Sequence, residues 1–221
     1  MASSKSGPKR GVFVVFEGPD GSGKTQQMAG LARHLRQNGE TVIETREPGG
    51  TPLGDEIRGL LLNREHVAID GLAELFLLAA ARAQHVQDVI EPAIAGGTIV
   101  LCDRYVDSSF AYQGGGRGLA VDSIAAVQQV ATGGRLPDGR VVLDVPVEVG
   151  LARRFADTAE INRLDRADGA FHERVREAYL SQAHTSEADW IVVDAVPSFE
   201  TVARDLQTRV LERIRHLRQS W

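Results

Sequence analysis

One eight-residue segment constrains the fold of this chain more than any other. Residues 18–25 read Gly-Pro-Asp-Gly-Ser-Gly-Lys-Thr, which matches the phosphate-binding pattern G-x-x-x-x-G-K-[ST]. The segment follows the apolar run 12–16 and precedes a helical pattern over 23–38. In a strand, loop and helix of this kind, backbone N–H groups and the helix N-terminus face bound phosphate. The alternative, a Gly-rich connection without chemistry, is disfavoured because motif and context agree.

Each residue type in this P-loop has a chemical reason. Glycines let successive N–H groups turn toward phosphate oxygens, Lys24 adds a mobile positive charge, and the Thr25 hydroxyl suits Mg²⁺. We therefore expect a nucleoside triphosphate to contact the whole segment: Gly18, Pro19, Asp20, Gly21, Ser22, Gly23, Lys24 and Thr25. The motif leaves open whether the γ-phosphate passes to water or to a second substrate.

Short β-rich runs alternate with longer helical patterns along the rest of the chain. The predicted strands are 12–16, 41–45, 98–102, 140–144 and 190–194, and the further predicted helices are 53–62, 70–95, 121–132, 147–157, 169–186 and 198–217. Strands that are apolar on both faces and separated by helices indicate a parallel sheet covered on both sides. The sequence predicts an α/β fold, a P-loop three-layer sandwich with a five-stranded parallel sheet between helices.

Length and composition favour one folded unit. With 221 residues, 43% of them apolar and 25% charged, the chain has an ordinary globular composition. Residues 1–10 are rich in Ser, Lys, Gly and Pro, so they are expected to form a disordered leader. Residues 11–221 contain no evident linker and are predicted to form a single domain.

Charge and hydropathy argue against several classes of protein. The formal net charge of −5 lacks the basic surplus of a dedicated nucleic-acid binder. The apolar runs are shorter than the roughly 18 residues of a membrane span, and the N-terminus does not read as a signal peptide, so a cytoplasmic location is expected. Cys102 is expected to be a buried structural thiol, and the six histidines lack metal-ligand spacing.

A second group of polar residues follows two other predicted strands. Residues 46–51 read Arg-Glu-Pro-Gly-Gly-Thr, and Asp103, Arg104 and Tyr105 follow the strand at 98–102. Ligands of open parallel sheets bind at the carboxyl ends of the strands, where a carboxylate suits Mg²⁺ and a guanidinium suits phosphate. The stretch 108–118 is so polar and Gly-rich that we expect an irregular, ligand-lining segment.

Together these motifs resemble those of bacterial thymidylate kinases. The resemblance rests on the P-loop, on REPGGT at 46–51, on Arg82 within an Ala-rich helix, on DRY at 103–105 and on AYQGGGRG at 111–118. It extends from about Gly11 to the last predicted helix. It implies transfer of the γ-phosphoryl group of ATP to dTMP, giving dTDP and ADP for dTTP synthesis, with Mg²⁺ as cofactor and a homodimer as the usual assembly.

By this resemblance, the acceptor nucleotide would contact side chains from several elements. Arg58 and Arg104 would hold its phosphate, and Asp20 would lie near its sugar and phosphate. Tyr112 would close against the deoxyribose and exclude a 2′-hydroxyl. The residues expected to bind this substrate are Glu47, Arg58, Leu78, Arg82, Arg104, Ser109, Tyr112 and Gln113.

The same resemblance implies a mobile lid over ATP at about 153–168, a segment whose composition alone reads as solvated surface. Related kinases without an arginine inside the P-loop place basic residues in the lid, and residues 19–22 contain none. Arg163 and Arg166 are therefore expected to contact the γ-phosphate, with Arg154 a weaker candidate. The expected catalytic residues are Lys24, Asp20, Arg104, Arg163 and Arg166, and the expected metal-binding residues are Thr25 and Asp103.

One position departs from the family pattern. Four residues before Arg82 the family commonly has a phenylalanine that stacks on thymine, whereas this chain has Leu78. Phe76 is two positions earlier and would point to a different face of the helix. Apolar packing by Leu78 is expected to replace stacking, with some loss of grip on the base.

Two other functions remain open at this stage. A P-loop switch would hydrolyse nucleotide without an acceptor, but the chain lacks the Asn-Lys-x-Asp segment that reads guanine. A related kinase acting on dUMP, dCMP or a nucleoside would differ only in acceptor preference. The apolar helix at 72–90 is a candidate dimer interface, although buried core and dimer face look alike in a sequence.

Overall fold

The computed structural model describes residues 10–63, 68–156, 161, 165–185 and 189–219. Its centre is a five-stranded sheet formed by β1 (Val12–Glu17), β2 (Val42–Arg46), β3 (Ile99–Asp103), β4 (Gly139–Asp144) and β5 (Trp190–Asp194). The order is β2-β3-β1-β4-β5, and every neighbouring pair is parallel. The predicted strands are confirmed to within one residue at each end, as is the α/β class.

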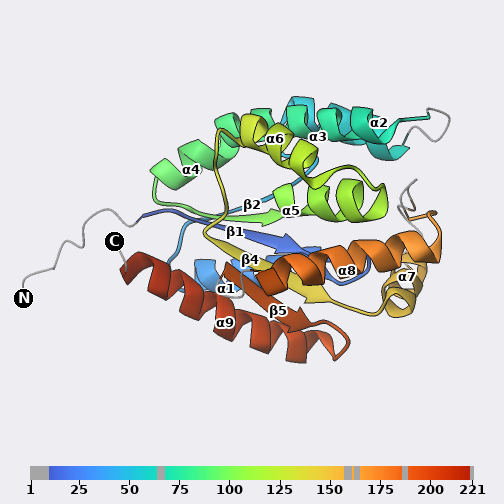
Figure 1. The fold of residues 1–221 in the computed structure, drawn as a ribbon. Helices are drawn as coiled ribbons and strands as arrows, with labels where there is room; N and C mark the ends of the chain where they lie inside the picture. Colours follow the sequence, from blue (N-terminus) through green and yellow to red (C-terminus); the bar gives the residue numbers. More distant parts are fainter. Residues whose placement is uncertain (1–9, 64–67, 157–160, 162–164, 186–188, 220–221) are drawn as a thin grey trace, which may run out of the picture.

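Helices cover both faces of this sheet. Figure 1 shows α9 below the sheet and α3, α4 and α6 above it. The helices are α1 (Lys24–Gln37), α2 (Pro52–Asn63), α3 (Gly71–His85), η1 (Val86–Ile90), α4 (Glu91–Ala95), α5 (Val106–Ser109), η2 (Phe110–Gly116), α6 (Val121–Thr132), α7 (Val147–Ala156), α8 (Gly169–Thr185) and α9 (Phe199–Gln219), of which η1 and η2 are π-helices. The predicted three-layer arrangement is confirmed.

The period-2 geometry of β1 explains how one strand serves two cores. Val12, Val14 and Phe16 face α1 and α9, where they pack with residues such as Leu31 and Leu206. The intervening Phe13 and Val15 face η1 and α4 on the other side. All six residues of β1 are buried, so the strand is fixed from both sides and holds the P-loop at its end.

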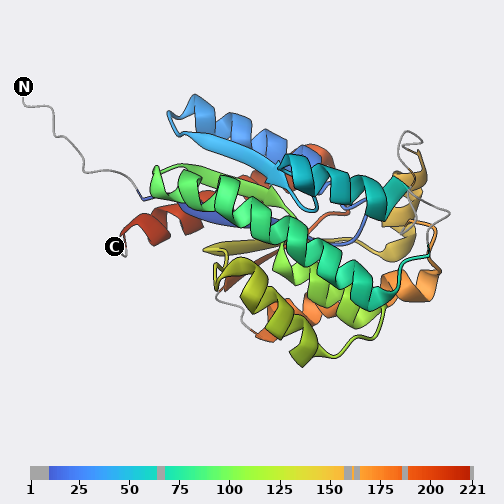
Figure 2. The ribbon, with the colours of Figure 1, turned by 90° about the horizontal axis from the view of Figure 1, so that it is seen from above.

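The predicted helix at 70–95 is present, but it is not uniformly α-helical. It consists of α3, the π-helix η1 and α4, which Figure 2 shows as one continuous rod across the upper face. Pro92 is the second residue of α4, two positions after the last residue of η1. Because proline has no N–H, the regular i to i−4 ladder cannot continue through it, and wider turns accommodate the interruption.

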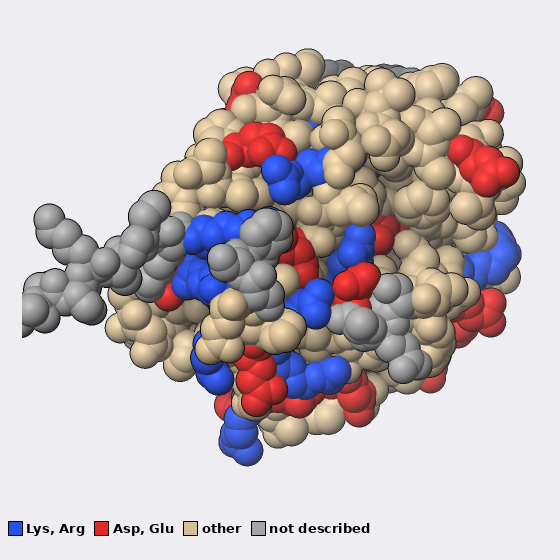
Figure 3. Space-filling view, turned by 60° about the vertical axis from the view of Figure 1, so that its left-hand side comes forward, with Lys and Arg blue, Asp and Glu red and all other residues tan. Residues whose placement is uncertain are grey.

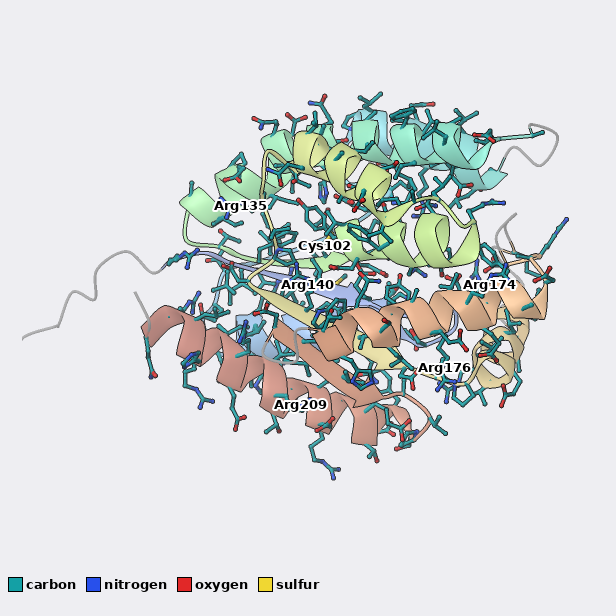
Figure 4. The ribbon with its side chains drawn as sticks, in the orientation of Figure 1. Cys102, Arg135, Arg140, Arg174, Arg176 and Arg209 are labelled. Atoms are coloured by element: carbon teal, nitrogen blue, oxygen red, sulfur yellow. The ribbon has the colours of Figure 1, made fainter. Side chains whose placement is uncertain are left out.

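The stretch 108–118 is largely helical, which corrects the expectation of an irregular segment. Residues 106–116 form α5 and η2, and the glycines serve helix packing. A Cβ on Gly115 would lie 2.7 Å from the Ala178 Cβ, and one on Gly116 would lie 2.5 Å from the Phe171 ring. Arg174, labelled on α8 in Figure 4, donates to the carbonyls of Gly115 and Gly116. Glycine is therefore needed for the close approach of α8.

Other sequence expectations concern burial and the membrane. Cys102 is fully buried inside β3, as expected (Figure 4). The helices of the described residues are all too short or too polar to cross a bilayer. The predicted leader at 1–10 lies outside the described residues except for Arg10.

Candidate active site

A single continuous cavity of about 1370 Å³ lies at the carboxyl ends of β1, β2 and β3. Open parallel sheets bind ligands at this edge. The cavity is larger than the roughly 300–1,000 Å³ of a pocket for one drug-sized ligand. Its lining includes the P-loop and also Leu78, Arg82 and Gln113, so its volume leaves room for two ligands side by side.

The P-loop adopts a backbone that only glycine tolerates at its tightest points. Gly18 has φ 130°, and a Cβ there would lie 2.4 Å from the Leu143 carbonyl oxygen of β4. Gly21 has φ 74°, and its Cβ would lie 1.9 Å from the Gly150 carbonyl oxygen of α7. Gly150 is itself constrained, since a Cβ on it would lie 2.6 Å from the Asp20 carbonyl oxygen. The loop is thus held between β4 and α7.

Lys24 and Thr25 begin α1 at the mouth of the loop. The Lys24 Nζ donates to the carbonyl oxygens of Gly18 and Pro19 at 2.9 and 2.8 Å. Burial and the neighbouring Arg104 charge lower the pKa of Lys24 to about 8, so the amine remains mostly protonated at pH 7. The Thr25 hydroxyl donates to Asp103 Oδ2 at 2.6 Å. The two residues predicted to hold the metal are therefore adjacent.

Arg104 is the centre of a charged cluster beside the P-loop. Its φ of 73° is the left-handed conformation, and it turns the side chain toward the cavity end of β1. Its Nη2 donates to Asp20 Oδ1 at 2.6 Å and to the Tyr112 hydroxyl at 3.1 Å, and that hydroxyl donates to Asp20 Oδ2 at 2.6 Å. Burial opposes ionisation of Asp20, but the charges of Arg104 and Lys24 prevail and lower its pKa to about 2. Asp20 is therefore a carboxylate throughout the physiological range.

Arg82 is buried in α3 and held by four partners from distant parts of the chain. Its Nε donates to Glu47 Oε2 at 2.6 Å, its Nη1 to Ser109 and Gln128, and its Nη2 to the Tyr105 carbonyl at 2.9 Å. A guanidinium has five N–H groups. The fifth, on Nη2, has no partner among the described residues.

Gln113 ends this side of the cavity with an unpaired acceptor. Its Nε2 donates to Glu74 Oε1 at 2.8 Å, and because a carboxylate only accepts, this bond fixes the orientation of the amide. Gln113 is 2% exposed, and its Oε1 has no hydrogen-bond partner in the described structure. A buried acceptor without a partner is costly, so a ligand donor that reached this oxygen would remove that cost.

Leu78 and Phe76 lie where helix geometry places them. Leu78 lines the cavity, whereas Phe76 is 54% exposed on another face of α3. Phe76 therefore does not supply the missing aromatic ring at the base end. Arg58 on α2 also lines the cavity, and its Nη1 donates to the Pro48 carbonyl at 3.1 Å.

The predicted lid arginines differ in whether they line the cavity. Arg163 lies outside the described residues, and Arg166 is exposed and does not line the cavity. Arg154, the weaker candidate, does line the cavity and pairs with the buried carboxylate of Asp165 at 3.0 Å. Arg153 also lines it, with its guanidinium bound to the carbonyls of Ala195 and Val196.

Comparison with known proteins agrees with this geometry. A family model described as Thymidylate kinase matches residues 16–206. Thymidylate kinases of Thermomicrobium roseum and Pseudomonas putida GB-1 are 51% and 46% identical to this chain over 208 residues, covering 94% and 93% of it and 98% and 99% of those proteins. That of Limosilactobacillus fermentum is 45% identical over 205 residues, or 92% and 96% of the two chains. The chain belongs to the thymidylate kinase family.

Several residues that shape this thymidylate kinase site were missed from the sequence. Glu17 and His85 are fully buried, and His85 Nδ1 lies 2.8 Å from Glu47 Oε1. Gln128 on α6 supports Arg82, and Gly150 on α7 supports the P-loop. Only Glu17 carried a usable signal, as a charged residue at the end of an apolar strand and next to the motif. The others depend on contacts between elements far apart in sequence.

Proposed function

We propose that this chain transfers the γ-phosphoryl group of ATP to dTMP, giving dTDP and ADP. The observation that carries the proposal is the single cavity, with a phosphate-binding loop at one end and the orphan Gln113 acceptor at the other. A cavity of this kind would hold donor and acceptor side by side, and phosphoryl transfer needs such positioning more than covalent chemistry. Membership of the thymidylate kinase family supports the same reaction.

Thymine complements the base end of the cavity in hydrogen-bond polarity. The N3–H of thymine would donate to Gln113 Oε1, and its O4 would accept the unpaired Nη2 proton of Arg82. Cytosine presents the opposite polarity at both atoms and would leave these buried groups unpaired. Ser109 accepts a hydrogen bond from Arg82 and so supports the base site, and Leu78, which lines the cavity, would pack against the thymine ring.

The phosphate and sugar of dTMP would occupy the middle of the cavity. Arg58 and Arg104 would hold the phosphate, within a pocket shaped by Glu47, which anchors Arg82. Two guanidinium groups offset the repulsion between donor and acceptor phosphates. Tyr112 and Asp20 are locked together by a 2.6 Å hydrogen bond, so their position is fixed where the deoxyribose would pass.

The P-loop would hold the phosphates of ATP, with Lys24 leaving its carbonyl partners to contact them. Thr25 and Asp103 supply a hydroxyl and a carboxylate oxygen 2.6 Å apart, which are the hard donors that Mg²⁺ prefers alongside phosphates and water. These residues fit the ion and would hold it, directly or through water. When bound, Mg²⁺ neutralises charge on the phosphates.

We further propose that the described fold from residue 11 onward acts as one domain with a lid at about 153–168. Arg154 already lines the cavity. Arg166, together with Arg163, which lies outside the described residues, is proposed to contact the γ-phosphate. Arg166→Ala is expected to lower kcat by on the order of 10²-fold with little change in dTMP binding. The matched variant Arg154→Ala tests whether the arginine already at the cavity carries this role instead.

The assembly is proposed to be a cytoplasmic homodimer. Leu72 and Phe76 on α3 and Val130 on α6 are exposed large apolar residues. Figure 2 shows α3 between α2 and α6, and Figure 3 shows mostly uncharged side chains toward the top of the molecule, where these helices lie. An apolar surface of this kind is typical of an interface between subunits. Analytical ultracentrifugation of the wild type and Phe76→Glu would test it.

The reaction itself is tested by ADP release with ATP, Mg²⁺ and one acceptor at a time. We expect strong dependence on dTMP, weaker activity with dUMP and little with dCMP, UMP or no acceptor. Equal ADP release with and without an acceptor would instead support a hydrolytic switch. A preference for dCMP would contradict the assigned base site but leave the P-loop assignment standing.

A further inference from the structure

Glu17 is a fully buried carboxylate that the proposed reaction does not use. It is the last residue of β1, immediately before the P-loop, and its side chain points into the protein beside Arg104. Its Oε1 accepts the Tyr105 N–H at 2.8 Å. Its Oε2 accepts the Ser108 hydroxyl at 2.6 Å and the Tyr179 hydroxyl at 3.1 Å. Three elements, β1, α5 and α8, thus meet at one acidic group.

The same two hydroxyls also contact the guanidinium of Arg104. Arg104 Nη1 donates to the Tyr179 hydroxyl oxygen at 2.9 Å and to the Ser108 hydroxyl oxygen at 3.3 Å. A guanidinium can only donate, so each hydroxyl must present a lone pair to Arg104 and send its own proton elsewhere. The Ser108 and Tyr179 hydroxyl oxygens are 2.7 Å apart. Either both hydroxyls donate hydrogen bonds to Glu17, or one donates to the other, which then donates to Glu17. In either case the hydrogen bonds run in one direction, from Arg104 to Glu17.

We propose that Glu17 is a positioning residue for Arg104, acting through the hydroxyls of Ser108 and Tyr179. The inference rests on the proposed role of Arg104 in holding the acceptor phosphate. An ionised Glu17 accepts a hydrogen bond from one or both hydroxyls, so each hydroxyl oxygen keeps a lone pair facing Arg104. A donor in place of Oε2 would reverse the chain of hydrogen bonds and turn a hydroxyl proton toward the guanidinium. Arg104 Nη1 would then lose its hydroxyl acceptors and keep only the Gly18 carbonyl, 3.2 Å away, so the guanidinium would shift from its place beside Asp20.

The charges around Glu17 come from every element packed against it. Asp107 on α5 is the nearest repulsive group, and it pairs with Arg140 of β4, which is labelled in Figure 4. Arg104 and Lys24 are the neighbouring cations. Tyr179 on α8 and the Cys102 thiol on β3 are titratable groups that the charge of Glu17 also affects. Burial and Asp107 raise the pKa of Glu17 to about 7, whereas Ser108, Arg104 and the Tyr105 N–H oppose that rise. The hydrogen bonds therefore supply much of what keeps this carboxylate ionised.

Glu17→Gln is a sharp test because the structure fixes how the new amide must lie. The Tyr105 N–H requires an acceptor at the Oε1 position, so the NH₂ group occupies the Oε2 position and donates to the hydroxyls. We expect KM for dTMP to rise roughly tenfold, with KM for ATP unchanged, because one charge-assisted hydrogen bond of Arg104 is lost. Asp138→Asn is the matched control, since Asp138 accepts the N–H of Phe13 in the same strand and lies far from Arg104.

A variant lacking both hydroxyls, Ser108→Ala with Tyr179→Phe, separates positioning from general stability. Adding Glu17→Gln in that background should leave KM for dTMP unchanged, because the link to Arg104 is already gone. An equal tenfold rise in both backgrounds would overturn the inference, as would an unchanged KM in Glu17→Gln alone. Arg104→Ala checks the underlying assignment: if KM for dTMP does not rise in that variant, the role of Arg104 fails. Thermal unfolding and equilibrium dTMP binding are measured by calorimetry for every variant, so that a loss of folding is distinguished from weaker binding of dTMP.

Discussion

The two ends of the cavity are built in different ways. The donor end centres on eight consecutive residues, 18–25, which follow β1 and include the first two residues of α1. The acceptor end combines side chains from the β2 and β3 ends, α3, η2 and α6, and almost every one is held by a partner far away in the chain. A local motif carries its own backbone geometry, whereas a site of dispersed side chains depends on the packing of the elements beneath it. Substitutions should therefore affect the two ends separately.

Lys24→Ala is expected to produce the largest difference between the effect on the donor end and the effect on the acceptor end. The amine is the mobile charge of the donor end, and its removal should lower kcat by on the order of 10²–10³-fold, as for other groups that stabilise transition-state charge. Equilibrium binding of dTMP should stay within a few-fold of wild type, since Lys24 does not reach the base end of the cavity. Parallel steady-state kinetics and calorimetry measure both quantities. A large loss of dTMP binding would show that the two ends are not separate.

Gln113→Ala should produce the matching effect at the acceptor end. Loss of the buried acceptor for thymine N3–H is expected to lower kcat/KM for dTMP by roughly 10–100-fold. The preference for dTMP over dCMP should shrink by a similar factor, because the discriminating group is gone. KM for ATP should not change. Kinetics with both acceptors measure this, and Gln182→Ala on α8 is a control amide outside the cavity.

Gly150→Ala tests whether the P-loop, although contiguous in sequence, depends on its packing against α7. A Cβ at this position would lie 2.6 Å from the Asp20 carbonyl oxygen, so α7 or the P-loop must move. We expect KM for ATP to rise by roughly tenfold, in keeping with about 1–3 kcal/mol for overpacking. Gly59→Ala is the control, since a Cβ there meets open space. An unchanged KM for ATP would mean that the loop tolerates movement of α7.

The pH dependence of dTMP binding should report on Glu17. Its pKa is raised from 4.5 to about 7, so the group is ionised above pH 7 and protonated as the pH falls below it. KM for dTMP should therefore rise between pH 8 and 6, as the proton reverses the hydrogen bonds to Arg104. Glu17→Gln removes this group, so any slope left in that variant belongs to the dTMP phosphate, whose second pKa is about 6. Identical slopes in both proteins would contradict the prediction.

The smallest effect is expected for Leu78→Phe. An aromatic ring facing thymine should add about 0.5–1.5 kcal/mol of stacking, which lowers KM for dTMP by a few-fold. KM for ATP should be unaffected, since Leu78 lines the cavity at the proposed base site and is not part of the P-loop. Phe76→Leu is a control at an exposed position of the same helix. An unchanged or higher KM for dTMP in Leu78→Phe would show that Leu78 already fits the base.

The architecture was predictable because its signals are local. Buried parallel strands are continuous apolar runs, and the five runs gave strand positions correct to one residue. The P-loop was predictable for the same reason, since strand, glycines and helix adjoin in sequence. The segment 106–116 was not predictable, because its glycines indicate a loop unless the approach of α8 is known. Local propensity gave way there to a tertiary contact.

The acceptor site was predictable only as a set of residues. The resemblance named Arg82, Arg104 and Gln113. Which of their donor and acceptor atoms are left for a ligand depends on hydrogen-bond partners that lie outside the motifs. Glu74 orients the Gln113 amide across 39 positions, and Glu17 reaches Tyr179 across 162. Hydrogen-bond polarity is a property of the assembled network, so it cannot be read from residue types alone.

The sequence by itself determined the sheet, the donor loop and the chemistry available to each end of the cavity. Those features follow from hydropathy period, glycine freedom and side-chain charge, all of which act within a few residues. Tertiary structure decided which buried acceptor atoms are left without a partner, why α8 requires Gly115 and Gly116, and how Glu17 comes to lie behind Arg104. These depend on which elements come together, because a buried polar group is satisfied only by the partners that folding brings to it.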